Sequence, residues 1–227
     1  MKPTTTLAEV RTPDGAKLCL QHHDGHFSMC VEGELLMSTR AWQSEAQMAE
    51  LGCAAFSGEA TKRVLIGGLG FGFTLRRVLE LAGPNVEVEV AELLPVMVEW
   101  NREHLRAVNG HLLDDPRVVV RITDVYALLA DSPRARYDAI LLDVDNGPVA
   151  MVDRGNGRIY SDYGLRVVSQ ALVPGGRVVF WSASTNRGFM RRLIDAGFEA
   201  RSIPAKAYPQ AVRETHTLFV ADWKGRA

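Results

Sequence analysis

The sequence lacks an excess of charge of either sign. Its 227 residues include 26 Lys and Arg and 27 Asp and Glu, so the formal net charge is −1. A protein that neutralises nucleic-acid phosphates, or one that binds anionic lipid through a polybasic segment, needs a surplus of cations. We therefore expect neither nucleic acid nor a membrane among the partners of this protein.

Cysteine is scarce, with three residues and no C-x-x-C pair. Disulfide frameworks are dense and usually even in number, and structural zinc sites need paired ligands, so we expect no disulfide and no metal site. The sequence also has no apolar run of about 18 residues, which a membrane span would need. Its first residues lack the apolar core of a signal peptide. These absences favour a cytoplasmic protein.

The periodicity of the sequence changes near residue 60. Residues 7–38 alternate apolar and polar positions between turn signals such as Asp24-Gly25, which predicts short antiparallel strands. Residues 40–56 have a helical pattern that includes Ala41, Met48, Leu51 and Ala55. We therefore divide the chain into an appendage of hairpins and a helix, residues 1–58, and a larger domain, residues 59–227.

The larger domain alternates strands and helices. The predicted strands are residues 64–66, 86–90, 118–122, 137–142, 177–181, 199–203 and 215–221, and the predicted helices are 73–81, 95–105, 125–129, 160–172 and 188–196. Such alternation predicts an α/β fold with a doubly wound, mostly parallel seven-stranded sheet. A turn is expected at residues 174–176. The last two strands have no helix between them and should form an antiparallel hairpin.

A glycine-rich segment, Gly67–Gly72, separates the first predicted strand of this domain from the first helix. Glycine permits a sharp turn and lets a ligand approach the backbone, and the following helix offers free N–H groups. The spacing is Gly68-x-Gly70-x-Gly72 rather than G-x-G-x-x-G, which disfavours an NAD(P) oxidoreductase and is typical of S-adenosylmethionine enzymes. A glycine turn without a ligand is the alternative.

Acidic residues follow three of the predicted strands. An acid at the position of Glu92 can accept hydrogen bonds from both hydroxyls of a ribose. Asp124 suits an adenine amino group, with the Val125 N–H on a ring nitrogen, and it equally suits the N-cap of the next helix. Asp143 would point into the same crevice, or would form an Asx turn. Leu93, beside Glu92, completes the predicted cofactor-binding set with Gly68, Gly70 and Gly72.

The order of these features resembles the spermidine synthase-like family, the polyamine aminopropyltransferases and their relatives on the class I S-adenosylmethionine methyltransferase fold. Five stretches carry the resemblance: the glycine segment 67–72 with residues 75–79, Val90-Ala91-Glu92-Leu93, Asp114-Asp115-Pro116-Arg117-Val118, Tyr137-Asp138 leading to Asp143, and Leu172-Val173-Pro174-Gly175-Gly176. The resemblance implies that Glu92 binds the ribose, Asp124 the adenine end, and Asp143 the reacting centre, where it helps to deprotonate the attacking amine. It also implies a homodimer.

Two departures from that family bear on the substrate. Aminopropyltransferases carry an Asp inside the glycine loop that holds the amino group of the donor, whereas this loop offers only Leu69 and Phe71. They also carry a second Asp three residues after the catalytic one, where this chain has Asn146, next to Asp145. An apolar loop would leave backbone N–H groups free for the carboxylate of S-adenosylmethionine.

Three functions remain open from the sequence. The first is an S-adenosylmethionine-dependent transferase that moves a methyl or other alkyl group to a small-molecule acceptor, with Asp143 as catalytic base. The second is a polyamine aminopropyltransferase that uses decarboxylated S-adenosylmethionine as its co-substrate. The third is a non-catalytic module that kept the nucleoside pocket.

Overall fold

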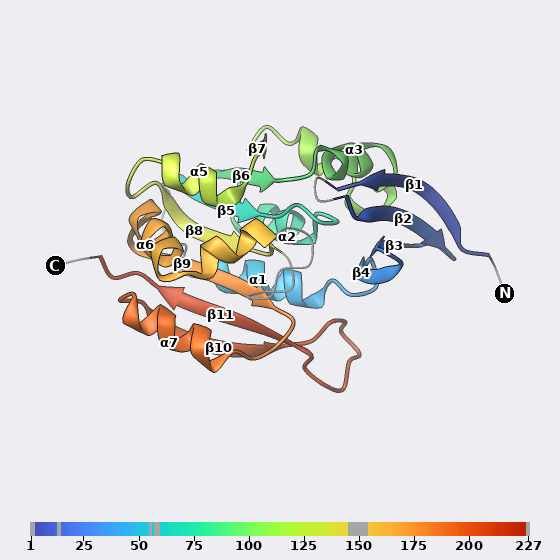
Figure 1. Ribbon diagram of the computed structural model, residues 1–227. Helices are drawn as coiled ribbons and strands as arrows, with labels where there is room; N and C mark the ends of the chain where they lie inside the picture. The colour runs from blue at the N-terminus through green and yellow to red at the C-terminus, as the bar shows by residue number, and fades with distance from the viewer. Residues whose placement is uncertain (1–2, 13–14, 55, 57–59, 145–153, 226–227) are drawn as a thin grey trace.

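The computed structural model describes residues 3–12, 15–54, 56, 60–144 and 154–225. These residues form a four-stranded antiparallel sheet and a seven-stranded sheet covered by helices (Figure 1). The arrowhead of β6 in Figure 1 points toward the small sheet, so the carboxyl ends of the parallel strands face it. No helix in the described part of the chain is both long and apolar enough to cross a bilayer.

The small sheet has its strands in chain order. They are β1 (Thr5–Arg11), β2 (Lys17–His23), β3 (His26–Val31) and β4 (Glu34–Ser38). Asp24 and Gly25 join β2 to β3 with φ of 49° and 81°. Positive φ at both central residues of a two-residue hairpin loop matches the right-handed twist of the strands. The predicted antiparallel strands are therefore present.

The large sheet has the order β10-β11-β9-β8-β5-β6-β7. Its strands are β5 (Lys62–Gly67), β6 (Val86–Glu92), β7 (Val118–Ile122), β8 (Tyr137–Leu142), β9 (Leu172–Ser182), β10 (Glu199–Ala205) and β11 (His216–Asp222). Strands β5 to β9 pair in parallel, and β11 is antiparallel to both β9 and β10. The predicted doubly wound sheet and its terminal hairpin are confirmed.

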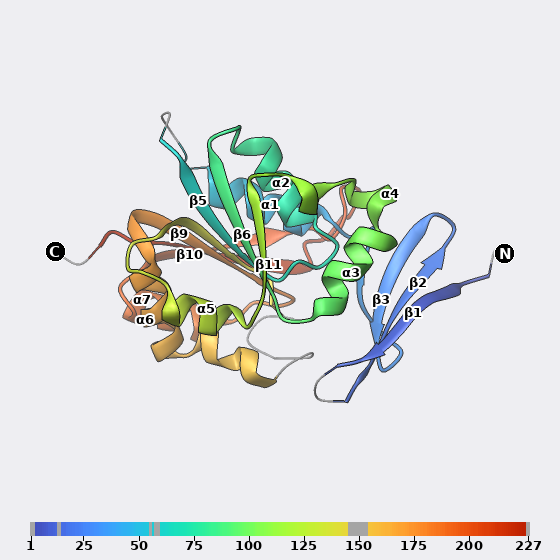
Figure 2. The ribbon, with the colours of Figure 1, turned by 90° about the horizontal axis from the view of Figure 1, so that it is seen from above.

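Helices cover both faces of the large sheet. They are α1 (Gln43–Cys53), α2 (Phe73–Leu81), α3 (Pro95–Glu103), α4 (Arg106–Asn109), α5 (Val125–Asp131), α6 (Asp162–Ala171) and α7 (Arg187–Asp195), with 3₁₀ turns η1 (Leu112–Asp114) and η2 (Arg154–Tyr160). Figure 2 shows α1 and α2 on one side and α5, α6 and α7 on the other. Strand β8 alternates accordingly: Ala139 and Leu141 pack under α1 and α2, and Ile140 and Leu142 pack under the other layer.

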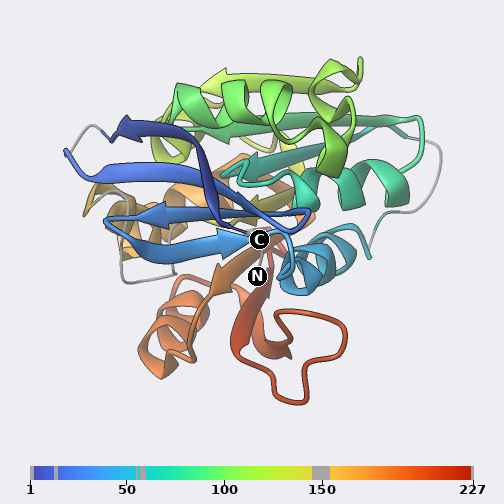
Figure 3. The ribbon, with the colours of Figure 1, turned by 90° about the vertical axis from the view of Figure 1, so that its right-hand side faces the viewer.

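The small sheet packs against α3 and the glycine segment through a third apolar cluster. Leu18 and Leu20 of β2 contribute to it, together with Phe71, Trp100 and Leu105, all of them almost fully buried. Figure 3 looks onto this sheet, with α3 behind its upper strands. Helix α1 instead packs on α2 and the large sheet. The division of the chain at residue 58 stays a prediction.

Most predicted bounds shift by one or two residues in the structure, and three differences are described here. The expected turn at 174–176 lies within β9, because the Gly175 N–H donates to Trp223 O (2.7 Å) and the Trp223 N–H donates to Gly176 O (2.8 Å). The helix expected over 95–105 ends at Glu103, and α4 begins at Arg106. The helix expected over 40–56 is α1, and Ala55 lies outside the described residues.

Candidate active site

The glycine segment connects β5 to α2 at the carboxyl edge of the large sheet. Gly68, Gly70 and Gly72 have φ of 90°, 51° and 81°, a region that side chains with a Cβ rarely adopt. Space is also limiting at Gly68, where a Cβ would lie 2.2 Å from the carbonyl oxygen of Asp143. The turn therefore requires glycine for its own backbone and for its close approach to β8.

Three N–H groups of the glycine segment have hydrogen-bond partners inside the protein. The Gly68 N–H donates to Ala91 O (2.9 Å), the Leu69 N–H to Glu92 Oε2 (2.8 Å) and the Gly72 N–H to Leu69 O (2.9 Å). These three groups are not available to a ligand carboxylate. The expectation of a loop whose backbone is free for such a group is therefore wrong at these three positions.

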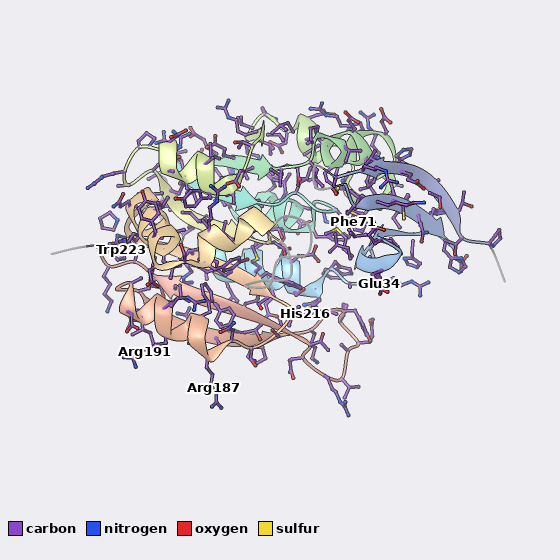
Figure 4. The ribbon with its side chains drawn as sticks, in the orientation of Figure 1. Glu34, Phe71, Arg187, Arg191, His216 and Trp223 are labelled. Atoms are coloured by element: carbon purple, nitrogen blue, oxygen red, sulfur yellow. The ribbon has the colours of Figure 1, made fainter. Side chains whose placement is uncertain are left out.

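The two apolar side chains of the loop are packed in the core. Leu69 is 4% exposed and joins the cluster under α1 and α2. Phe71 is 1% exposed and lies between the loop and the small sheet, where Figure 4 labels it. Both residues thus stabilise the loop by packing in the apolar core, and neither lines the cavity.

Glu92 ends β6 and lies buried next to the loop. Its Oε2 accepts the Leu69 N–H and its Oε1 accepts the Leu94 N–H, both at 2.8 Å. Burial raises the pKa of this carboxyl above its ordinary value, and the backbone hydrogen bonds, which favour the anion, oppose that shift. A carboxylate has about four acceptor positions, and the N–H groups of Leu69, Leu93 and Leu94 do not use all of them. Glu92 can therefore hold the loop and still accept from a ligand hydroxyl.

Asn101 of α3 also holds the loop, and sequence reasoning missed it. Its Nδ2 donates to Gly70 O (2.9 Å) and to Met97 O (2.8 Å), and its Oδ1 accepts from Asn109. The side chain is 2% exposed. The available signal was a polar residue on the otherwise apolar face of the helix that follows β6.

Asp124 follows β7 and caps α5. Its Oδ1 accepts the Ala127 N–H at 2.9 Å, so the N-cap alternative is present in the structure. Its Oδ2 lies 3.3 Å from Arg158 Nη2, and the Arg158 guanidinium lies 4.9 Å from the centre of the Tyr126 ring. Val125, the first residue of the helix, is buried against Gly67.

A cavity of about 250 Å³ brings most of the predicted residues together. It lies between the small sheet, which contributes Leu18, Met29 and Met37, and the carboxyl ends of the parallel strands. The predicted site residues that line it are Gly68, Gly70, Glu92, Leu93, Asp124, Val125 and Asp143. Gly72 is set back from the lining, at the N-terminus of α2. Asp145 and Asn146 lie outside the described residues.

The opposite wall of the cavity contains residues that do not belong to the predicted site. Glu45 and Ser44 come from the first turn of α1, Trp181 from β9 and His216 from β11, where Figure 4 labels it. Trp181 Nε1 donates to Ser44 Oγ at 3.0 Å, and its ring lies 4.7 Å from the His216 ring.

Two residues of this wall, Glu45 and His216, have pKa values that differ from their ordinary values. Burial, and then the charge of Asp143, raise the pKa of Glu45 well above its ordinary value. Burial lowers the pKa of His216, which therefore stays neutral near pH 7. The cavity thus holds four carboxyl groups, Glu45, Glu92, Asp124 and Asp143, and no Lys or Arg among its described lining residues.

A comparison of the sequence with known protein families shows which family this chain belongs to. Residues 47–188 match the family profile described as the spermine/spermidine synthase domain. The chain belongs to the spermine/spermidine synthase family. The matched range contains the glycine segment, Glu92, Asp124 and Asp143, so the resemblance noted in the sequence is confirmed.

Curated relatives of this spermine/spermidine synthase family member are named polyamine aminopropyltransferases. The protein of that name from Mycobacterium tuberculosis is 35% identical over 170 residues, which are 73% of this chain and 30% of the relative. The protein of that name from Aeropyrum pernix is 32% identical over 127 residues, 54% of this chain and 38% of the relative. The chain thus spans about a third of the length of these relatives.

Solved structures of spermidine synthases have the same fold. A spermidine synthase in complex with the transition-state analogue AdoDATO superposes with a TM-score of 0.78 at 20% identity, covering 97% of this chain and 74% of that chain. The spermidine synthase from Thermotoga maritima gives a TM-score of 0.75 at 18% identity, covering 97% and 73%. The fold comparison therefore extends over both sheets, whereas the family profile spans residues 47–188.

Proposed function

We propose that this protein transfers the aminopropyl group of decarboxylated S-adenosylmethionine to a small-molecule polyamine acceptor. One observation carries the proposal: the cavity at the carboxyl edge of the sheet has four carboxyl groups and no Lys or Arg among its described lining residues. Both reactants are cations, a sulfonium with an ammonium group and an amine. Carboxylates replace the water that such cations lose on binding, whereas they repel the carboxylate of S-adenosylmethionine.

The residues that would carry out the reaction lie at the ends of three strands, β6, β7 and β8. The attacking amine nitrogen forms a bond to the aminopropyl carbon, the bond from that carbon to sulfur breaks, and methylthioadenosine leaves with the sulfur electron pair. The amine loses one proton, which Asp143 would accept. Glu92 would hold the ribose hydroxyls and Asp124 with Val125 the adenine, so that nucleoside binding aligns carbon and sulfur for in-line attack.

The names of the curated relatives support this proposal over a general alkyl transferase. Methyl transfer from S-adenosylmethionine itself is the second candidate, and it is favoured by the absence of an acid from the glycine loop. The internal bonds of the Gly68, Leu69 and Gly72 N–H groups weigh against that candidate, because they remove donors that a carboxylate would need.

Product analysis separates the candidates. The chain is incubated with 1,4-diaminobutane and either decarboxylated S-adenosylmethionine or S-adenosylmethionine. Aminopropyl transfer predicts methylthioadenosine and an aminopropylated diamine in equal amounts, from the decarboxylated donor only. S-adenosylhomocysteine formed from S-adenosylmethionine would favour methyl transfer instead. Binding of methylthioadenosine without turnover, across a panel of amines, would favour a non-catalytic module.

A further inference from the structure

Glu45 is an acid of the cavity that neither the sequence motifs nor the nucleoside-binding residues account for. It lies in the first turn of α1, which packs on α2 and on β8, β9 and β11 of the large sheet. Its side chain is partly buried, and it lines the cavity together with Asp143. Two acids from distant parts of the chain therefore line one cavity.

Within the described residues, Glu45 takes part in no hydrogen bond and no ion pair. A carboxylate that is partly withdrawn from water usually has such partners, because without them it loses hydration and gains nothing in return. The neighbouring Ser44 hydroxyl accepts from Trp181 Nε1, and the facing His216 is neutral near pH 7 because burial lowers its pKa. The protein thus provides no cation for Glu45 from this wall.

The charged group that acts on Glu45 carries a charge of the same sign. Burial and the charge of Asp143 together raise the pKa of Glu45 well above its ordinary value. Two carboxyl groups in a space of low dielectric do not ionise together unless a cation joins them. An alkylammonium group is a cation of suitable chemistry, because it donates three hydrogen bonds and can bridge two carboxylates.

We propose that Glu45 and Asp143 form an ammonium subsite, in which Glu45 positions a primary ammonium group of the reactants and determines specificity for it. This inference rests on the proposed transfer function and names the substrate class of the same cavity. Both the aminopropyl donor and a diamine acceptor carry a primary ammonium group, so either reactant can supply it. Trp181 and His216 form the aromatic side of this subsite.

An acid in the first helical turn has an ordinary structural role, since it interacts favourably with the positive end of the helix dipole. That role makes a different prediction, because its loss would lower stability and leave ligand selectivity unchanged. Glu50 offers a matched control on the same helix. It is exposed and pairs with Arg77 at 2.7 Å, outside the cavity lining.

The test compares wild type, Glu45→Gln and Glu50→Gln by isothermal titration and steady-state kinetics. Methylthioadenosine and decarboxylated S-adenosylmethionine are titrated separately, since the first lacks the aminopropyl ammonium group. KM and kcat are measured with 1,4-diaminobutane and with butylamine, which lacks the second amine. Circular dichroism and a thermal melt establish that each variant is folded.

If Glu45 holds the donor, Glu45→Gln weakens binding of decarboxylated S-adenosylmethionine on the order of 10- to 100-fold. The affinity for methylthioadenosine should stay within about twofold of wild type. If it holds the acceptor, donor affinity stays constant, and the KM for 1,4-diaminobutane rises by a similar factor while that for butylamine does not. Glu50→Gln should change none of these values. Unchanged donor affinity and unchanged diamine KM in folded Glu45→Gln would overturn the inference while leaving the transfer function intact. Wild type that neither binds methylthioadenosine nor turns over would instead remove the proposed function.

Discussion

Gly68 and Asp143 are in direct backbone contact. A Cβ at Gly68 would lie 2.2 Å from Asp143 O, and the Asp143 N–H donates to Gly67 O at 2.9 Å. The glycine segment after β5 and the proposed base, Asp143, after β8 are therefore held together by neighbouring parallel strands. Their relative position is set by the sheet and does not depend on a mobile side chain.

Gly68→Ala is expected to destabilise the protein by about 3 kcal/mol and to weaken methylthioadenosine binding, because a Cβ would force Gly68 and Asp143 apart and strain a positive φ. Urea denaturation and nucleoside titration measure the two effects. Gly83→Ala is the matched control: Gly83 has φ of 66° and no atom within 4 Å of a built Cβ, so it carries the φ strain alone, about 1 kcal/mol. Equal losses in the two variants would mean that the contact with Asp143 is unimportant.

Glu92→Gln should weaken methylthioadenosine binding at least tenfold, because the amide offers one acceptor where the Leu69 and Leu94 N–H groups require two. Glu89→Gln on the same strand is the comparison. Glu89 pairs with Arg121, Arg136 and the Tyr137 hydroxyl outside the cavity lining. The Glu89→Gln variant should therefore be less stable than wild type but bind methylthioadenosine with unchanged affinity. Retained affinity in Glu92→Gln would exclude Glu92 from ribose binding.

Glu45→Gln should be more stable than wild type at neutral pH, on the order of 1 kcal/mol. The folded pKa of Glu45 is raised above its ordinary value of 4.5, so the folded state binds more protons than the unfolded state above that pH. Wild-type stability therefore falls as pH rises from about 4.5 through the folded pKa, and the variant escapes this loss. Urea denaturation from pH 4 to pH 8 measures the gap, which should widen with pH. A constant gap would show that Glu45 is not destabilised by ionisation.

Asp124→Ala separates two roles that the sequence left open. Loss of the cap on α5 should cost about 1 kcal/mol of stability. Ser161→Ala removes the corresponding cap of α6, where Ser161 Oγ accepts the Gly164 N–H at 3.1 Å, and should cost a similar amount. Only Asp124→Ala should also weaken methylthioadenosine binding, by about tenfold or more if Asp124 Oδ2, which lies 3.3 Å from Arg158 Nη2, also accepts from adenine. Equal nucleoside affinity in both variants would leave Asp124 with the capping role alone.

The sequence predicted the large sheet well because its strands are short apolar runs separated by amphipathic helices. Helix 73–81 and strands 118–122 and 137–142 have the predicted bounds. The error at 174–176 has a physical cause: Pro174-Gly175-Gly176 has turn composition, yet its backbone pairs with Trp223 beyond β11. Long-range pairing of this kind overrides a local preference and has no local signature.

The site was predicted only where residues lie at fixed positions relative to strand ends. Glu92, Asp124 and Asp143 each follow a parallel strand, so the topology brings them to one edge. Glu45 lies on a helix that precedes the first strand of the large sheet, and an acid in a first helical turn looks ordinary in sequence. Asn101 acts on the glycine loop through the tertiary packing of α3. The roles of Glu45 and Asn101 could not be predicted from the sequence, because they depend on how the small sheet, α1 and α3 pack around the cavity.

The most direct test of the account is the transfer rate of Asp143→Asn with decarboxylated S-adenosylmethionine and 1,4-diaminobutane, measured beside methylthioadenosine affinity. Asp138→Asn is the control, because Asp138 lies at the opposite end of β8 and accepts from Arg63 N at 2.9 Å. We predict that Asp143→Asn lowers kcat by about 10²- to 10⁴-fold and keeps nucleoside affinity within about threefold, whereas Asp138→Asn retains both. A folded Asp143→Asn variant with wild-type kcat would contradict the account.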